Sequence, residues 1–199
     1  MNVAAEHSTA IAGTYRLLAR LWLREVDTPF LDSLMQAPLS NAFTAAGGSL
    51  PEDASPSTLE ELSVDYCRLF LGPARHFPPF QSVWERGQFQ GEAVQSMNQY
   101  LSIANYETEL MPDHLGVQLD VMAEILEALT PDAQNPNAIV DLARCYFGTH
   151  LPWTDPLFDS AIEQTTTDFY RSVIEMTRDF LKSEHAVWRA SAVNLDTVP

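Results

Sequence analysis

Glu109, Asp113 and His114 are the residues whose types and spacing could carry out acid–base chemistry. A histidine can act as a general base when a carboxylate orients its ring, and Glu109 adds a third acid. Neighbouring residues on a helix point about 100° apart, however, so Asp113 is poorly placed to orient His114. We therefore expect a protein that is not an enzyme and has no catalytic residue, with a small hydrolase that uses Asp113 and His114 as an alternative.

Asp113 and His114 also have structural interpretations. They follow Pro112, which suits the first turn of a helix, and a carboxylate there would lie near unpaired N–H groups and the positive end of the helix dipole. Asp113 would then be a helix cap, and His114 a partly buried histidine that a backbone carbonyl satisfies. The spacing alone does not separate these roles from a role in binding.

The residues that follow form the helix around which the chain is organised. Its apolar side chains recur at the helical period and leave only a narrow acidic strip. Such a helix is expected to be mostly buried, with other helices around it. The apolar positions are Leu115, Val117, Leu119, Val121, Met122, Ile125, Leu126 and Leu129, and the acidic ones are Asp120, Glu124 and Glu127.

Similar patterns predict the other helices, and no stretch alternates β-branched and polar residues for long enough to form a strand. A surface loop is expected from Ala46 to Ser57 and an irregular segment from Gly72 to Trp84. The fold class is all-α: a single-domain helical bundle of roughly eight to ten helices over residues 1–190, with a flexible tail over 191–199. The expected helices run from Ala4 to Arg24, from Thr28-Pro29 to Pro38, from a Ser57/Glu60 capping box to Gly72-Pro73, from Gly91 to Leu101, from Asn135-Pro136 to Gly148, from Asp155-Pro156, and through Phe169 and Phe180.

Composition excludes several classes of partner. Of the 199 residues, 46% are hydrophobic, which is enough for a sizeable core. Lysine and arginine number 11 against 27 acidic residues, giving a net charge of -16. A field of that sign repels nucleic acid and anionic lipid and attracts basic partners.

The cysteines and the N-terminus indicate a cytoplasmic location. Cys67 and Cys145 form neither a CxxC pair nor a disulfide framework, so reduced thiols are expected. The first residues lack the basic region and apolar core of an export signal, and no apolar run is long enough to span a bilayer. We expect no membrane insertion.

No cofactor and no metal are expected. A phosphate-binding Gly-rich loop with a lysine is missing from the sequence. None of the histidines lies four residues from another, so a helical zinc motif is missing too. The histidines are His7, His76, His114, His150 and His185.

Five short motifs occur in a fixed order along the chain. They are Tyr66-Cys-Arg-Leu-Phe-Leu-Gly72, Pro78-Pro-Phe-Gln-Ser-Val-Trp84, Pro112-Asp-His-Leu-Gly116, His150-Leu-Pro-Trp153 and Phe169-Tyr170. Together they resemble the TorD/DmsD family of cytoplasmic redox-enzyme maturation chaperones, over a stretch from about Tyr15 to Leu181. An ordered set of motifs is more specific than any one of them.

The resemblance implies an all-helical protein that binds the twin-arginine leader, and often the apo form, of a molybdopterin-dependent reductase. Such a chaperone holds its client until the cofactor is inserted and then releases it for Tat export. Physical chemistry agrees, because a leader with two arginines before an apolar segment requires carboxylates beside an apolar groove. A GTP-regulated binding switch is the alternative that the resemblance leaves open.

The resemblance also assigns residues. Tyr66 and Leu69 share a stripe with Leu62 and are expected in the core, whereas Arg68 and Phe70 are expected to be exposed. Gln81 stands where the family often has an acid, and Glu109 lies one residue farther from Pro112 than the family's acid does. The leader-binding residues carried over are Tyr66, Leu69, Phe70, Gly91, Pro112, Asp113 and His114, with Arg68, Phe80, Trp84 and Glu109 as a possible extension of the groove.

Overall fold

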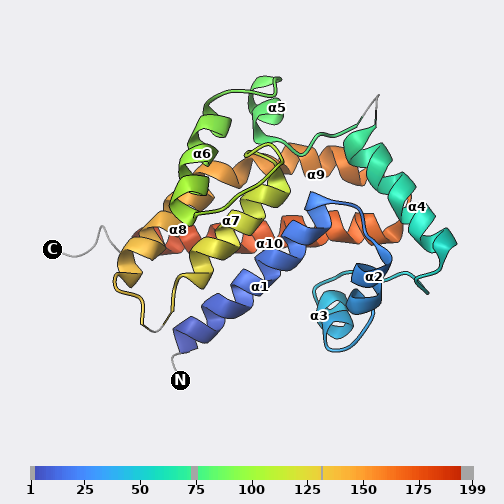
Figure 1. Cartoon of the computed structure of the whole chain (residues 1–199), viewed down its shortest axis with the longest axis horizontal. Helices are drawn as coiled ribbons and strands as arrows, with labels where there is room; N and C mark the ends of the chain where they lie inside the picture. The colour runs from blue at the N-terminus through green and yellow to red at the C-terminus, as the bar shows by residue number, and fades with distance from the viewer. Residues whose placement is uncertain (1–2, 73–75, 131, 194–199) are drawn as a thin grey trace. The chain divides into compact units, whose positions relative to one another are not determined.

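The computed structural model describes residues 3–72, 76–130 and 132–193. Within these ranges it contains ten α-helices, a π-helix and a 3₁₀-helix but no β-strand, which confirms the all-α prediction (Figure 1). The predicted tail overlaps the last helix up to Val193, and residues 194–199 lie outside the described ranges. The elements are α1 (Val3–Leu23), α2 (Thr28–Leu34), α3 (Leu39–Ala45), α4 (Pro56–Tyr66), the π-helix η1 (Cys67–Leu71), α5 (Gln81–Arg86), α6 (Glu92–Ala104), α7 (Leu115–Glu127), α8 (Pro136–His150), the 3₁₀-helix η2 (Pro152–Thr154), α9 (Asp155–Ile162) and α10 (Asp168–Val193).

The chain divides into two compact units. The first unit comprises Met1–Leu23, Phe80–Trp153 and Leu181–Pro199, and the second comprises Arg24–Pro79 and Thr154–Phe180.

Helix α7 is the central element of the first unit. Ten of its thirteen residues are buried, as its wide apolar face predicts. Helix α1 lies antiparallel beside it (Figure 1), with Leu23 facing Gly116. A Cβ on Gly116 would lie 2.7 Å from Leu23 Cγ, so the close approach of the two helices requires glycine there.

One arginine of α1 holds the acidic strip of α7. Arg16 donates hydrogen bonds to Asp120 at 2.7 Å, to Glu124 at 2.5 Å and to Glu127 at 2.9 Å. Three carboxylates against one guanidinium leave this Arg16 cluster with a net charge of 1 − 3 = −2 at neutral pH.

Aromatic side chains fill the core of the second unit. Phe43 of α3 stacks on Phe169 of α10 with ring centroids 5.9 Å apart. Tyr66 lies 5.2 Å from Phe70 and 5.7 Å from Tyr170, also between ring centroids. The first and last of the five sequence motifs therefore meet here, and aromatic packing accounts for their residue types.

A buried aspartate holds the residue that caps α10 within this unit. Asp65 accepts hydrogen bonds from the backbone N–H groups of Thr166 and Thr167 and, at 2.7 Å, from the Thr167 hydroxyl. The Thr167 hydroxyl in turn accepts a hydrogen bond from the N–H of Tyr170, so Thr167 caps α10 and Asp65 ties α4 to that cap.

Predicted helix starts that use proline are confirmed for α2, α8 and α9, whereas other boundaries were wrong. Helix α3 was not predicted, because its seven residues bury only Phe43 and give no periodic signal. Ser55, not Ser57, caps α4, so the predicted capping box is wrong. Gly148 does not end α8, which continues to His150, since a glycine is tolerated inside a helix.

Candidate functional site

Asp113 lies wholly buried before α7 and caps a helix other than its own. Its Oδ2 accepts a hydrogen bond from the backbone N–H of Ser82 at 2.9 Å, and its carbonyl accepts one from Gln81 at 3.1 Å. Both donors belong to the first turn of α5, and this explains why a helix begins inside the segment predicted to be irregular. Asp113 Oδ1 and Ser82 Oγ, both buried, have no hydrogen-bond partner among the described residues.

Helix α7 begins at Leu115, and its N-cap is His114 and not Asp113. Nδ1 of His114 accepts a hydrogen bond from the N–H of Gly116 at 3.0 Å, so a backbone donor satisfies it and not the carbonyl we expected. Burial lowers the pKa of His114 from 6.5 to about 4. The ring is therefore neutral at pH 7 and carries its proton on Nε2.

The pair lacks the geometry of a general base and its orienter. Asp113 and His114 form no hydrogen bond with each other in the structure, as their adjacent positions predicted. The ring of His114 instead meets Phe80 edge to face, with centroids 5.1 Å apart, and the two backbones form an isolated antiparallel bridge. Phe80 in turn contacts Phe89 at 5.6 Å between ring centroids.

Two of the sequence motifs meet, together with Gln118 of α7, in a buried polar network of the first unit. Gln81 Oε1 accepts hydrogen bonds from Gln118 Nε2 at 2.7 Å and from His150 Nδ1 at 2.9 Å. Gln118 Oε1 accepts one from the indole N–H of Trp153 at 2.9 Å, and Gln81 Nε2 donates to the carbonyl of Thr149 at 2.9 Å. The network fixes α5 against α7 and α8.

This network also sets the protonation of His150. The carbonyl oxygen of Gln81 can only accept, so His150 Nδ1 carries a hydrogen. Burial lowers the pKa of His150 to about 4, which leaves Nε2 free to accept from the hydroxyl of Ser96 at 2.9 Å. A carboxylate at position 81 would lack the N–H that donates to Thr149, and this explains why an amide suits this chain.

Two adjoining hollows lie on one face of α6, and together we name them the α6 surface. The apolar hollow, of about 750 Å³, is lined among others by Phe89, Gly91, Val94 and Met111. The polar hollow, of about 690 Å³, is lined among others by Asn98, Leu101, Glu107, Leu110 and Pro112. Val94, Asn98 and Leu101 follow one another by four and three residues, so both hollows share one side of the helix.

The α6 surface combines exposed apolar side chains with unpaired carboxylates. Phe89 is 50% exposed and Leu110 is 42% exposed. Glu107 lines the polar hollow, and Glu109 lies two residues farther along the same loop. Both are exposed, and within the described ranges neither pairs with a basic side chain.

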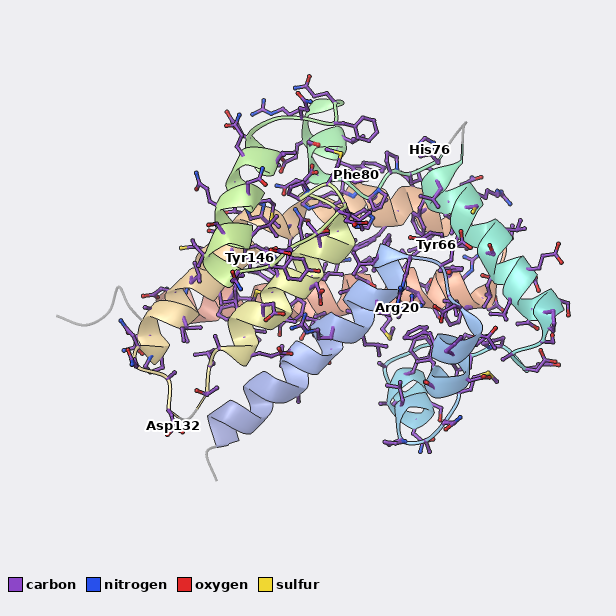
Figure 2. All side chains as sticks on the ribbon, in the orientation of Figure 1. Arg20, Tyr66, His76, Phe80, Asp132 and Tyr146 are labelled. Atoms are coloured by element: carbon purple, nitrogen blue, oxygen red, sulfur yellow. The ribbon has the colours of Figure 1, made fainter. Side chains whose placement is uncertain are left out.

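The structure places the predicted site residues in both units. Gly91 and Pro112 line the α6 surface. Phe80, which Figure 2 labels, contacts His114 and the lining residue Phe89. Trp84 is half-buried on α5. Tyr66, Leu69, Phe70 and Arg68 belong to the second unit.

The exposure of the second-unit residues matches the prediction except at Phe70. Tyr66 and Leu69 are buried and Arg68 is exposed, as predicted. Phe70 is only 4% exposed, so its predicted exposure was wrong. Cys67–Leu71 is a π-helix, whose wider turn changes the direction in which each following side chain points.

Sequence analysis missed Phe89, Val94, Met111 and Glu107, which line the α6 surface. Phe89 gave no usable signal, because a single apolar residue in a loop shows no period and isolated exposed apolar side chains are common. Among the described residues no three His, Cys, Asp or Glu side chains are grouped to hold a metal ion. No helix in the described part of the chain is long and apolar enough to cross a bilayer.

Comparison with known proteins gives the family. Residues 35–159 match the family model described as nitrate reductase delta subunit. The chaperone protein YcdY of Escherichia coli (strain K12) is 27% identical over 180 residues, covering 87% of this chain and 91% of that protein. The chaperone protein TorD of Vibrio vulnificus (strain YJ016) is 28% identical over 162 residues, covering 75% and 74%. No solved structure gives a significant match.

The family model spans more than half of the chain, and the chaperone relatives match it over most of their length. The chain therefore belongs to the nitrate reductase delta subunit family and is a TorD-family chaperone of redox-enzyme maturation.

Proposed function

We propose that this chaperone binds the twin-arginine leader of a molybdopterin-dependent oxidoreductase along the α6 surface. The observation that carries the proposal is the position of the apolar hollow next to a polar hollow that contains an unpaired carboxylate. A leader has the same order of chemistry, with two arginines followed by an apolar segment. Glu107 and Glu109 would pair with the arginines, and Phe89, Val94 and Met111 would contact the apolar segment.

The buried residues Asp113 and His114 would support the α6 surface without contacting the leader. Asp113 holds the start of α5, and His114 supports Phe80, which contacts the exposed ring of Phe89. Gly91 and Pro112 would contact the leader directly. The leader-binding roles of Tyr66, Leu69, Phe70, Arg68 and Trp84 stay predictions.

Binding of the leader would let the chaperone hold the apo-enzyme in the cytoplasm until its cofactor is inserted and Tat export can follow. The relatives named chaperone TorD and YcdY support this role. We propose binding and not catalysis, because the acid and imidazole most suited to catalysis are buried and engaged by backbone N–H groups.

The test is a titration of a synthetic twin-arginine leader peptide into the pure protein. Phe89→Ser removes an exposed ring from the apolar hollow, so the peptide should bind roughly tenfold more weakly. Val187→Ser is the control, because Val187 of α10 is an apolar residue of similar exposure (53% against 50%) that lines neither hollow. Equal affinities of the wild type and Phe89→Ser would contradict the proposal.

A further inference from the structure

A second groove of the first unit lies on the opposite side of α6. It encloses about 480 Å³ between the C-terminal ends of α6 and α7 and the first half of α8. Ile103 and Ala104 point away from the face that carries Val94 and Asn98, so this groove is separate from the α6 surface. We name it the aliphatic groove, after its lining of Ile103, Ala104, Ile125, Ala128, Ile139 and Leu142.

The aliphatic groove leaves apolar side chains uncovered. Ile103 is 62% exposed although it lies beside a hollow of aliphatic side chains. Its neighbours Ile139 and Leu142 are half-buried. Helices α6, α7 and α8 pack against one another, and residues of all three line the groove.

Carboxylates with an uncompensated charge border the same groove. Glu124 and Glu127 line it, and their side chains are 37% and 45% exposed. Both belong to the Arg16 cluster, whose net charge is −2. The only other polar partner of the cluster's carboxylates in the described ranges is the hydroxyl of Tyr106, which donates to Asp120 at 2.6 Å and adds no positive charge.

We propose that the aliphatic groove docks an amphipathic helix of the client protein that carries basic residues beside its apolar face. A groove between packed helices, lined by aliphatic side chains, suits a helix that inserts residues at the helical period. The charge complementarity selects a basic helix, since Glu124 and Glu127 face it at the rim. A second copy of this chain is a poor occupant, because two chains of net charge -16 repel each other.

This docking site goes beyond leader binding and does not depend on it. The probe is a synthetic helix of roughly 15 residues with an aliphatic stripe flanked by lysines, long enough to keep helical structure. A matched peptide carries glutamates in place of the lysines. Binding of each peptide to the full chain is measured by fluorescence anisotropy, and the leader peptide is titrated in parallel.

The proposal predicts that the lysine peptide binds and that the glutamate peptide binds roughly tenfold more weakly or not at all. Ile103→Ser should lower the affinity for the lysine peptide by roughly tenfold, and Glu127→Gln should lower it by a few fold. Neither change should alter leader affinity, because both side chains lie off the α6 surface. Leu71→Ser, at the same 62% exposure as Ile103, is the control for a general loss of apolar surface.

Two results would overturn the proposal. The first is a lysine peptide that fails to bind the wild-type chain, or binds no better than the glutamate peptide. The second is an affinity that Ile103→Ser leaves unchanged or that Leu71→Ser lowers equally. A wild-type chain that binds the lysine peptide as predicted but does not bind the leader peptide would instead contradict the function proposed for the α6 surface.

Discussion

The side chain of Asp113 accepts a hydrogen bond from the backbone N–H of Ser82 at 2.9 Å, across 31 positions of sequence. Asp65 does the same for Thr166 and Thr167 across about a hundred positions. Each unit thus contains a buried aspartate that binds backbone N–H groups at or just before the start of a helix distant in the sequence. These carboxylates hold helix starts in place, and in the first unit that start follows Phe80, whose ring contacts Phe89 of the α6 surface.

Replacement of Asp113 distinguishes a structural role at the start of α5 from direct contact with the leader. Asp113→Ala should lower the free energy of unfolding by about 1 to 2 kcal/mol, because the N–H of Ser82 loses its acceptor. Asp113→Asn keeps a capping oxygen and should recover most of that loss together with leader affinity. Urea unfolding and leader titration on both variants provide the measurement, with His114→Gln alongside. Unchanged stability with a tenfold to hundredfold loss of affinity in Asp113→Asn would instead mean that its charge pairs with a leader arginine, a loss of about 1.5 to 3 kcal/mol.

Gly91 should be sensitive to a methyl group and Gly148 should not. Gly91 precedes α6 with φ at +148°, a conformation that alanine rarely adopts, although a Cβ there would meet no atom within 4 Å. Gly91→Ala should therefore cost about 1 to 3 kcal/mol of stability. Gly148→Ala, inside α8 with equally open space, should stabilise by about 0.5 to 1 kcal/mol. Thermal melting checks both, and a neutral Gly91→Ala would show that the turn relaxes.

The buried histidines make stability depend on pH. The pKa values of His114 and His150 are lowered to about 4 in the folded chain, against about 6.5 when unfolded. The unfolded chain therefore binds protons first as the pH falls, and the stability present above about pH 6.5 is lost toward pH 4. Each histidine should remove about 2 kcal/mol between pH 7 and pH 5.

Urea unfolding at several pH values checks this dependence. His114→Gln should lose about 2 kcal/mol less than the wild type between pH 7 and pH 5. His185→Gln is the control, because His185 is exposed on α10. The same pH dependence in His114→Gln and the wild type would show that His114 is not held neutral by burial.

Local sequence patterns predicted most helices. The helix starts that they did not predict depend on contacts between segments distant in the sequence. The apolar period predicted α7, and Asn135-Pro136 predicted the start of α8. The start of α5 could not be predicted, because the carboxylate that caps it comes from Asp113. For the same reason Asp113 was predicted to cap α7, the helix that follows it, and not α5.

The candidate site was predicted only in part. Motif resemblance found Gly91 and Pro112, which line the α6 surface. Phe89 and Met111 were missed, because a single apolar residue in a loop shows no period and its exposure depends on the fold. Phe70 was placed on the wrong side, since no sequence signal marked the π-helix at Cys67–Leu71.

Salt should weaken leader binding only in part. Pairs between Glu107 or Glu109 and leader arginines are exposed and therefore screened, whereas contact with Phe89 is not. The Kd should rise by roughly tenfold at most between about 0.05 M and about 0.5 M salt. Titrations across this range give the slope. Complete loss of binding in moderate salt would indicate nonspecific attraction to the net charge of -16.

The most direct test of the central claim is site-specific photo-crosslinking of a twin-arginine leader peptide to opposite faces of α6. A photoreactive residue is placed either at Asn98, which lines the polar hollow, or at Ile103, which lines the aliphatic groove; both positions are exposed. If the leader binds along the α6 surface, the chain labelled at Asn98 crosslinks to the peptide and the chain labelled at Ile103 does not. Crosslinking at Ile103 but not at Asn98, or at neither position under conditions where the peptide binds, would contradict the account.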